Sequence, residues 1–535
     1  MKEKSEKEIV QSDYNGQMKD KRRGAKLRKG IYGRVIFFFF LIAIQIAVIV
    51  FFLLKLRPYI EYYFGGSLLL SFIFVIYLAN REGRVEFKIS WILLLLLSPI
   101  VGIVTYIIFH TNIGNKELKK SLNQAEYETR KYSPSLEETD ALLSKRENLD
   151  IKGLGDYLAT KGGVSPHTDT KVKYFCCGED FLPDFCEALK SAKKFIFLEF
   201  FIIDVDESWT KILEILEQKV EEGVEVRLLY DGFGSLTIAT NKYQKYLASK
   251  GIISHIFMPL IPFFSVHLNN RDHRKIVVID GEVAYTGGLN LTNEYFNVGK
   301  NRFPYWQDNG IRVEGPAILN YTQLFLQNWN METKVEDDYE KYLSLPYEHY
   351  EKDGIVIPYG DNIYNGVDIA EDVYLYIINN AKKYLYITTP YMIIDKTVEN
   401  ALIFAANRGV DVKIIVPSVP DHKITFCVGK TYLKTLVENG VKIYLYTRGF
   451  IHEKTFVSDD KLATVGSVNL DYRSLYHHFE TNTLFYKNSI IPEIKKDLTR
   501  LMKDDCSEMK VGDYKKIPSK DRFLGRVFRV IAPLL

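Results

Sequence analysis

The sequence predicts an α/β protein with two tandem repeats around one active site, preceded by N-terminal transmembrane helices. Three observations support this: a histidine, lysine and aspartate pattern occurs twice, the segments before the two copies match, and the N-terminal part contains long apolar stretches. The 535-residue chain is 47% hydrophobic and 14% aromatic, which suits a membrane-attached protein. Its formal net charge of only +3 argues against a nucleic-acid-binding surface.

The repeated pattern is His-x-Lys-x-x-x-x-Asp, and each copy is followed by a small turn that ends in asparagine. One such match would be weak, but two copies with the same turn are hard to obtain by chance. The copies are His273, Lys275 and Asp280, and His452, Lys454 and Asp459. The turns are Gly287–Asn290 and Gly466–Asn469.

These residue types suit phosphodiester chemistry. A lysine ammonium can neutralise phosphoryl oxygens. One histidine can attack phosphorus while a second protonates the leaving oxygen, and an aspartate can orient an imidazole. We therefore predict that all six motif residues are catalytic, with a structural role as the alternative for Asp280 and Asp459. The turn residues predicted to bind substrate are Gly288, Asn290, Ser467 and Asn469.

Each motif is predicted to lie on one strand and its exit. His273 and Lys275 are two residues apart, so they project from the same face of a strand. The following apolar residues 276–279 are typical of a strand, and short second strands are expected at 283–286 and 462–465. Two unrelated edge strands with solvated charges are the alternative interpretation.

The repeat extends well before the motifs. Residues 192–197 match 381–386, and residues 222–227 match 408–413. Both copies read in the order helix, strand, helix, strand and then motif, so each is an α/β unit of domain size. One half-site in each unit predicts a single active site at a pseudo-twofold interface.

Several short sequence stretches resemble those of a known family. The stretches 230–235, 270–275, 287–290 and 466–474 resemble the phospholipase D superfamily and, within it, the bacterial cardiolipin synthases. The resemblance extends from the second apolar segment to the C-terminus. It implies two tandem phospholipase D-type α/β repeats.

The resemblance also implies an activity, namely reversible phosphatidyl transfer between two phosphatidylglycerol molecules, giving cardiolipin and glycerol through a phosphatidyl-histidine intermediate. It places the nucleophile at His273 and the acid/base at His452, although the near symmetry of the halves leaves the reverse order open. The implied partners are phosphatidylglycerol and anionic membrane lipid, without nucleic acid. No cofactor or metal is expected, because histidine catalysis needs none and the five cysteines lack metal-ligand spacing. The oligomeric state is left open.

Further candidates lie outside the motifs. Glu199 on the first repeat's early strand is predicted to face the site, and Asp231 to contact a headgroup, with packing roles as alternatives. Asp308 and Glu480, downstream of the two motifs, are candidates to bond the imidazoles. No function is predicted for the adjacent pair His477–His478.

Other functions use the same residues. A hydrolytic phospholipase D would let water attack the intermediate. A nuclease would need a basic groove, which the charge distribution does not indicate. A non-catalytic membrane scaffold would be expected to have lost motif residues, and all six are present.

The N-terminal part is predicted to be a basic cytoplasmic tail (1–34) and a multi-pass region (35–112) in the cell membrane. Its spans are expected at about 35–54, 62–79 and 89–109, the last interrupted by Ser98, Pro99 and Gly102. The basic tail places the N-terminus inside, so three spans would place the catalytic part outside and two would place it in the cytoplasm. Both arrangements stay open.

The remaining boundaries follow from composition. Residues 113–150 form a polar connector, 151–345 the first repeat and 346–535 the second. The chain ends with a predicted amphipathic basic helix containing Phe523 and Arg526, suited either to anionic lipid or to packing on its own domain. The apolar loop 261–266 is expected to line a lipid entrance or to be core.

Overall fold

The computed structural model describes residues 59–110, 115–259, 270–334 and 337–534, together with a few positions between 43 and 55. These residues form two compact units. The larger contains Glu117–Pro259 and Asn269–Arg529, and the smaller contains the residues before Glu117 and the C-terminal Val530–Leu535. The tail 1–34, most of the first predicted span and the loop 261–266 lie outside the described residues.

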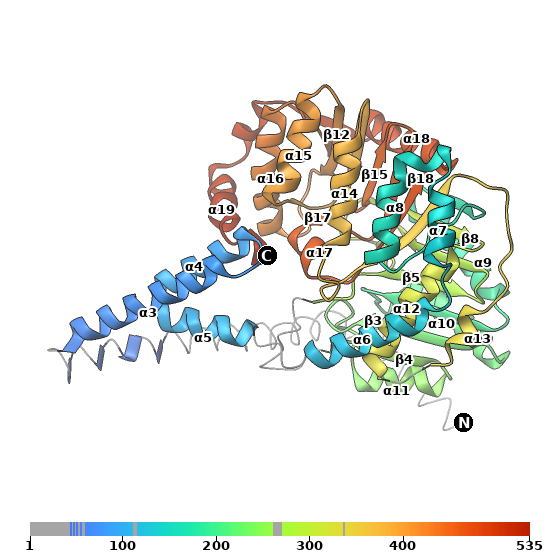
Figure 1. Cartoon of the computed structure of the whole chain (residues 1–535), viewed down its shortest axis with the longest axis horizontal. Coiled ribbons are helices and arrows are strands. Elements are labelled where there is room, and N and C mark those ends of the chain that lie inside the picture. The colour runs from blue at the N-terminus through green and yellow to red at the C-terminus, as the bar shows by residue number, and fades with distance from the viewer. Residues whose placement is uncertain are drawn as a thin grey trace. The chain divides into compact units, whose positions relative to one another are not determined.

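Between Tyr59 and His110, the described residues of the smaller unit form three α-helices (Figure 1). They are α3 (Ile60–Asn80), α4 (Val85–Leu97) and α5 (Pro99–His110). Among the described residues, Glu61–Asn80 is the one stretch of helix long and apolar enough to cross a membrane. The short helix η5 (Ala532–Leu534) follows Val530, whose carbonyl accepts a hydrogen bond from Ser90 Oγ at 3.1 Å.

The continuous span expected over 89–109 is instead two helices. Ser98 adopts an extended conformation (φ −153°, ψ 81°) between them. Pro99 is the physical reason, because proline disfavours the helical conformation of the preceding residue and lacks an N–H. At about 1.5 Å per residue, neither α4 nor α5 reaches across a bilayer core of about 30 Å. A Cβ on Gly102 would lie 2.9 Å from Leu95 Cα, so the two helices pack backbone to backbone.

The first repeat of the larger unit is built on a seven-stranded sheet. Its strands are β1 (Lys171–Phe175), β2 (Phe195–Phe200), β3 (Glu225–Asp231), β4 (Ile253–Phe257), β5 (Lys275–Ile279), β6 (Val283–Gly287) and β8 (Gly310–Glu314). Its helices are α9 (Gly178–Ser191), α10 (Glu207–Glu221), α11 (Asn241–Ser249), α12 (Ile318–Thr333) and α13 (Tyr339–Leu343). The central strands β2 and β5 are buried along their whole length, which explains their continuous apolar sequences.

The second repeat is built on an eight-stranded sheet. Its strands are β9 (Ile355–Asp361), β10 (Tyr384–Thr388), β12 (Asp411–Pro417), β13 (Lys442–Tyr446), β15 (Thr455–Ser458), β16 (Leu462–Gly466), β18 (Glu480–Tyr486) and β19 (Cys506–Met509). Its helices are α14 (Ile369–Asn380), α15 (Lys396–Asn407), α16 (Lys423–Glu438), α17 (Tyr472–Tyr476), α18 (Ile490–Asp504) and α19 (Ser519–Arg529), with the short η4 (Asp513–Lys516). Helices α14, α15 and α16 lie next to one another (Figure 1).

The two sheets have the same strand order, which confirms the predicted duplication. The first runs β1-β8-β6-β5-β2-β3-β4, and the second, read from the opposite edge, runs β9-β18-β16-β15-β10-β12-β13 before the extra strand β19. The pairings also agree: β2 is parallel to β3 and antiparallel to β5, just as β10 is parallel to β12 and antiparallel to β15. The second strands after each motif, β6 and β16, lie where the sequence predicts them.

The polar connector is helical: its first helix packs on the first repeat, while Tyr486 and Lys487 of the second repeat donate to the Glu147 carbonyl near its end. It consists of α6 (Asn115–Arg130), α7 (Leu136–Leu143) and η2 (Arg146–Asn148), followed by α8 (Leu149–Lys161). Gln323 of α12 donates a hydrogen bond to the Thr129 carbonyl at 2.8 Å, and Leu122 is buried in the same core. The C-terminal basic helix α19 packs on α16, where a Cβ on Gly525 would meet the Cys427 carbonyl at 2.3 Å.

Candidate active site

Backbone hydrogen bonds join the two repeats just before each motif lysine. Phe479 N–H donates to the Arg271 carbonyl at 2.8 Å, and His273 N–H donates back to the Phe479 carbonyl at 2.9 Å. The other half has the same arrangement, in which His452 N–H donates to the Gln307 carbonyl at 2.7 Å. There, the two-residue strands β7 (Trp306–Gln307) and β14 (Phe450–Ile451) pair in parallel.

These contacts place a carboxylate of one repeat behind each histidine of the other. His273 Nδ1 lies 3.0 Å from both carboxylate oxygens of Glu480, and His452 Nδ1 lies 2.7 Å from Asp308 Oδ2. All four side chains are buried. With Nδ1 bonded to a carboxylate, Nε2 is the nitrogen left for chemistry in each ring. The motif histidines therefore lie before strands β5 and β15 rather than on them, and the crossing segments hold them.

The two carboxylates have different surroundings. Glu480 also accepts hydrogen bonds from the hydroxyls of Ser467 and Ser474, the latter at 2.7 Å. Burial alone would raise the pKa of Glu480, but its interactions with the His273 and His478 rings hold the pKa below its ordinary value, so the carboxylate is ionised. Burial raises the pKa of Asp308 to about 7, although Lys454 opposes the shift. Behind Asp308, a Cβ on Gly288 would lie 2.0 Å from its Oδ1, so this glycine makes room for the carboxylate.

Each motif lysine bonds back to its own histidine. Lys275 Nζ donates to the His273 carbonyl, and Lys454 Nζ donates to the His452 carbonyl and lies 2.7 Å from His452 Nδ1. Burial lowers the pKa of Lys275 to about 7 and that of Lys454 to about 8. The nearby Lys454 ammonium also lowers the pKa of Lys275, so both lysines act in one site.

Burial also holds both imidazoles neutral. It lowers the pKa of His273 to about 3 and depresses that of His452 strongly, with the lysine charges adding to the effect at His452. A bound phosphodiester anion would act in the opposite direction, because a negative charge nearby favours the imidazolium form.

The motif aspartates lie at the far end of their strands. The five residues of strand β5, which span roughly 16 Å at about 3.3 Å per residue, lie between His273 and Asp280. The Asp280 carboxylate accepts hydrogen bonds from three successive backbone N–H groups, of Lys193, Lys194 and Phe195, at 2.6–2.8 Å. Asp459 does the same for Lys382, Lys383 and Tyr384 at 2.6–2.9 Å. The geometry therefore favours the structural alternative for both aspartates over direct catalysis.

The two turn asparagines are buried and incompletely bonded. Asn290 Oδ1 accepts a hydrogen bond from Ile202 N–H at 3.0 Å, while its Nδ2 has no hydrogen-bond partner among the described residues. Within that same part of the chain, Asn469 Oδ1 also has none. A buried amide with a free donor suits a phosphoryl oxygen.

Glu199 and Asp231 support the first motif from beneath rather than joining the histidines. Asn328 donates to Glu199 at 2.7 Å, and burial raises the pKa of Glu199 beside Asp272. Asp231 accepts hydrogen bonds from the N–H groups of Phe233 and Gly234 at 2.7 and 2.8 Å, and from that of Asp272 at 3.1 Å. Asp231 thereby holds the segment that carries His273, whereas Glu199 bonds to Asn328 of α12 through one carboxylate oxygen.

Sequence reasoning missed His478. Its ring centroid lies 5.6 Å from that of His273, and its Nδ1 is 3.6 Å from Glu480 Oε1. The signal was present, because a residue two positions before Glu480 projects from the same face of an extended chain. Aromatic rings also flank the histidines: Phe201 lies 5.0 Å from His273, and Trp306 lies 5.3 Å from His452.

Two clusters in the described part of the chain have the composition of a metal site. His273, His478 and Glu480 each offer one ligand atom, and these atoms lie within 4.8 Å of one another. Cys176, Cys177 and Asp180 form the second cluster at the surface of the first repeat. The first has the nitrogen and oxygen ligands that Zn²⁺ accepts, and occupation by a metal would engage the proposed nucleophile.

Comparison with known proteins agrees with this geometry. The family model for "Cardiolipin synthase, PLD-like domain" matches residues 185–329 and 374–502. An uncharacterized protein of Streptococcus mutans is 41% identical over 86% of this chain and 99% of its own length. A cardiolipin synthase of Halalkalibacterium halodurans is 33% identical over 86% of this chain and 91% of its own length.

A solved structure shares the fold. The phosphatidylserine synthase of Haemophilus influenzae superposes with a TM-score of 0.53 at 15% identity, covering 68% of this chain and 95% of that one. The family match includes both repeats and both histidine motifs. The chain belongs to the cardiolipin synthase family of proteins with phospholipase D-like domains.

Proposed function

We propose that the protein transfers a phosphatidyl group from one phosphatidylglycerol molecule to another, producing cardiolipin and glycerol. Membership of the family makes it a phosphatidyltransferase acting on phospholipid. The observation that carries the proposal is the crossed pairing, in which each motif histidine is bonded through Nδ1 to a carboxylate of the opposite repeat. This arrangement supplies two oriented imidazoles in one site, as a two-step transfer requires.

In the first step, His273 Nε2 attacks the phosphorus of phosphatidylglycerol. The new P–N bond forms as the P–O bond to the headgroup glycerol breaks, and His452, which is protonated once the phosphodiester anion is bound, delivers its Nε2 proton to the departing oxygen. We assign the nucleophile to His273 because ionised Glu480 behind it stabilises the positive charge that the ring gains on attack.

In the second step, a hydroxyl of another phosphatidylglycerol attacks the phosphatidyl-histidine. His452 now accepts the hydroxyl proton, the new P–O bond forms, and the P–N bond breaks to release His273 and cardiolipin. The second step is the reverse of the first with a different alcohol, so the whole transfer is reversible.

The remaining residues stabilise charge on the phosphoryl group. Lys275 and Lys454 would neutralise the non-bridging oxygens, and the free amide donor of Asn290 would bind one of them. Each transition state carries more negative charge on these oxygens than the bound lipid does. Fixed donors in a buried site therefore lower the barrier rather than only tightening binding.

The smaller unit would anchor the enzyme in the membrane that contains its substrate. We propose a multi-pass anchor in the cell membrane, comprising the predicted span at 35–54, helix α3 and the α4–α5 pair. The two short helices would enter the bilayer together, since residues 89–109 carry no charged side chain.

A product assay tests the proposal. Purified full-length protein is given labelled phosphatidylglycerol in liposomes, with and without chelator. Cardiolipin and glycerol in equal amounts, lost in His273→Ala, are expected. Phosphatidic acid as the product would show that water is the acceptor, and loss of turnover with chelator would show that a metal takes part.

The order of the histidines is tested with a phosphatidyl ester whose leaving group needs no protonation. His452→Ala should still form a covalent phosphatidyl-protein in one burst, because it lacks only the acid. His273→Ala should form none. The opposite pattern would exchange the two roles.

A further inference from the structure

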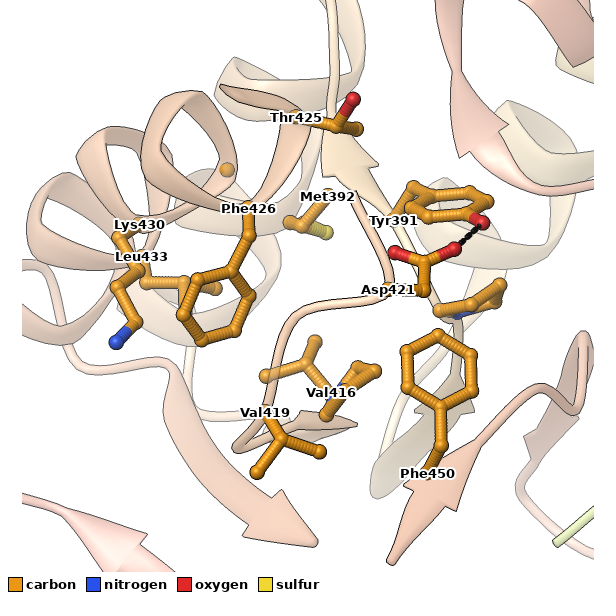
Figure 2. A pocket seen from close by; sticks show the side chains of 13 residues that line it. Tyr391, Met392, Val416, Val419, Asp421, Thr425, Phe426, Lys430, Leu433 and Phe450 are labelled. Carbon is orange, nitrogen blue, oxygen red and sulfur yellow. Dashed lines mark hydrogen bonds between the residues drawn. The ribbon is translucent and has the colours of Figure 1, made fainter. Parts of the chain in front are cut away.

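An apolar pocket lies in the second repeat at the carboxyl ends of strands β10 and β12 (Figure 2). It is a partly open hollow whose empty space of about 370 Å³ includes open solvent. Its lining is mainly apolar and comes from the two-residue strand β11 (Met392–Ile393), the end of β12, β14 and α16, including Met392, Val416, Phe426 and Phe450. This edge of a parallel sheet is where α/β proteins usually bind ligands.

The pocket adjoins the catalytic histidine of the same repeat. Phe450 forms one wall and is two residues before His452, with their ring centroids 6.3 Å apart. Figure 2 shows Phe426 and Phe450 on different sides of the hollow, with the hydrogen-bonded pair Tyr391–Asp421 near Phe450. Tyr295, whose ring centroid lies 5.4 Å from that of His452, is close enough to Tyr391 to influence its pKa.

The rim carries a positive charge. Lys430 extends from α16 on the side of the hollow away from Asp421 (Figure 2), and its ammonium lies 4.1 Å from the centre of the Phe426 ring. A lysine with its stem along an apolar wall and its charge at the mouth complements an anionic lipid.

Gly429 leaves room along one wall of the pocket. It occupies the interior of the 16-residue helix α16 and lines the pocket. A Cβ at this position would meet Met392 O at 3.5 Å and Met392 N at 3.9 Å, which are ordinary contacts, so neither packing nor backbone conformation requires glycine. Glycine in the middle of a helix is less stable than alanine. A larger side chain at this position would occupy space in the pocket, so substitutions of Gly429 test what the pocket holds.

We propose that this pocket binds a fatty acyl chain of the phospholipid whose phosphorus reacts at His452 and His273. The inference rests on the proposed phosphatidyl transfer and assigns the site that holds the lipid's tail. The chain would lie between Phe426 and Phe450 and against Gly429, which aligns the glyceryl phosphate with the histidines. A bound chain also excludes water from the site, which favours transfer over hydrolysis.

The test fills the pocket without weakening the helix. Gly429→Ala and Gly429→Leu are made in the full-length protein, with Gly153→Ala and Gly153→Leu as matched controls. Gly153 is also inside a helix, α8, but a Cβ there has nothing within 4 Å. Transfer is measured with a series of phosphatidylglycerols that differ only in acyl length, together with the thermal midpoint of each variant.

Gly429→Ala should keep or raise the thermal midpoint while lowering kcat/KM for long-chain lipid several-fold. Gly429→Leu should lower it by roughly tenfold or more, as overfilling of a fitted site does. Short-chain lipid should be used as well as by wild type, and the Gly153 variants should show no dependence on chain length. Phe426→Ala, which enlarges the pocket, should move the preference toward longer chains.

An unchanged chain-length profile in both Gly429 variants would overturn the inference. A loss of rate that is equal at every chain length would also overturn it. Failure of the proposed function would look different, since wild type would then make no cardiolipin. In that case, binding of fluorescent long-chain phosphatidylglycerol to His273→Ala, with and without Gly429→Leu, still decides whether the pocket holds the chain.

Discussion

At the scale of single residues, the two halves of the site are similar but not equal. His273 has an ionised glutamate supported by two serine hydroxyls, whereas His452 has an aspartate whose pKa is raised to about 7. The position equivalent to Ser467 is Gly288, which leaves space for Asp308. The nearly symmetric motifs therefore have different chemistry, in keeping with one nucleophile and one acid/base.

The lysines predict a fall in activity as the pH rises. Lys275 and Lys454 have pKa values lowered to about 7 and about 8, so they are charged below these values and lose their protons above them. Since the phosphodiester stays anionic, kcat/KM for phosphatidylglycerol should fall as the pH rises through this range. The measurement is a pH profile of initial rates. A rate that stays constant from about pH 6 to about pH 9 would contradict the shifted values.

Substitution of Gly288 by alanine should remove most activity. The new Cβ would lie 2.0 Å from Asp308 Oδ1, so the carboxylate must move away from His452. We expect kcat to fall by about 100-fold or more, the size of a lost acid/base contribution. Ser467→Gly is the matched control in the other repeat, because it removes one hydroxyl from Glu480 without displacing the carboxylate. An equally large fall in kcat in Ser467→Gly would argue against the idea that Gly288 is needed to leave space for Asp308.

At the scale of elements, each motif strand runs from the active site at one end of its sheet to the opposite end. The strand begins beside the histidine and ends at an aspartate that binds the backbone at the start of β2 or β10. Both aspartates have positive φ, of 57° and 55°, a conformation that aspartate and asparagine tolerate better than most residues. The number of residues between the motif histidine and aspartate is therefore set by the length of the strand between them.

Asp280→Asn and Asp459→Asn should lower stability rather than catalysis. Asparagine keeps the size and tolerates the backbone conformation, but its amide cannot accept all three N–H groups. The expected cost is about 1–3 kcal/mol, and more at buried Asp280 than at half-buried Asp459. Thermal unfolding and kcat at low temperature check this. Loss of kcat at unchanged stability would restore the catalytic role that the sequence predicted.

At the scale of the whole molecule, one chain supplies the complete site. The bonds between His273 and Glu480 and between His452 and Asp308 both join the two repeats of the same chain. The helices α12 and α18, which follow equivalent strands β8 and β18, share one hydrophobic core with both sheets. The repeats are therefore held together by packing as well as by the site.

Mixing two inactive variants should not restore activity. His273→Ala and His452→Ala copies each lack one histidine of their own site, so liposomes containing both should make no cardiolipin. Equal amounts of wild-type and inactive protein provide the control for reconstitution. Recovery of activity in the mixture would show that the site forms between two chains.

The sequence by itself determined the repeated motif, the strands that carry it and the order of elements in each half. These are local properties, set by residue type and by periodicity along the chain. It also determined that residues 89–109 are apolar, but Pro99 interrupts the helix there, and composition alone did not show whether a neighbouring helix would accommodate the break.

Only the tertiary structure decided which carboxylate serves which histidine. Glu480 lies 207 positions from His273 and Asp308 lies 144 positions from His452, so no local pattern connects them. Their pairing follows from the crossing of two backbone segments at the interface of the repeats. The depressed lysine pKa values, the structural role of the motif aspartates and the pocket beside His452 depend in the same way on burial and distance, which exist only once the two sheets have packed together.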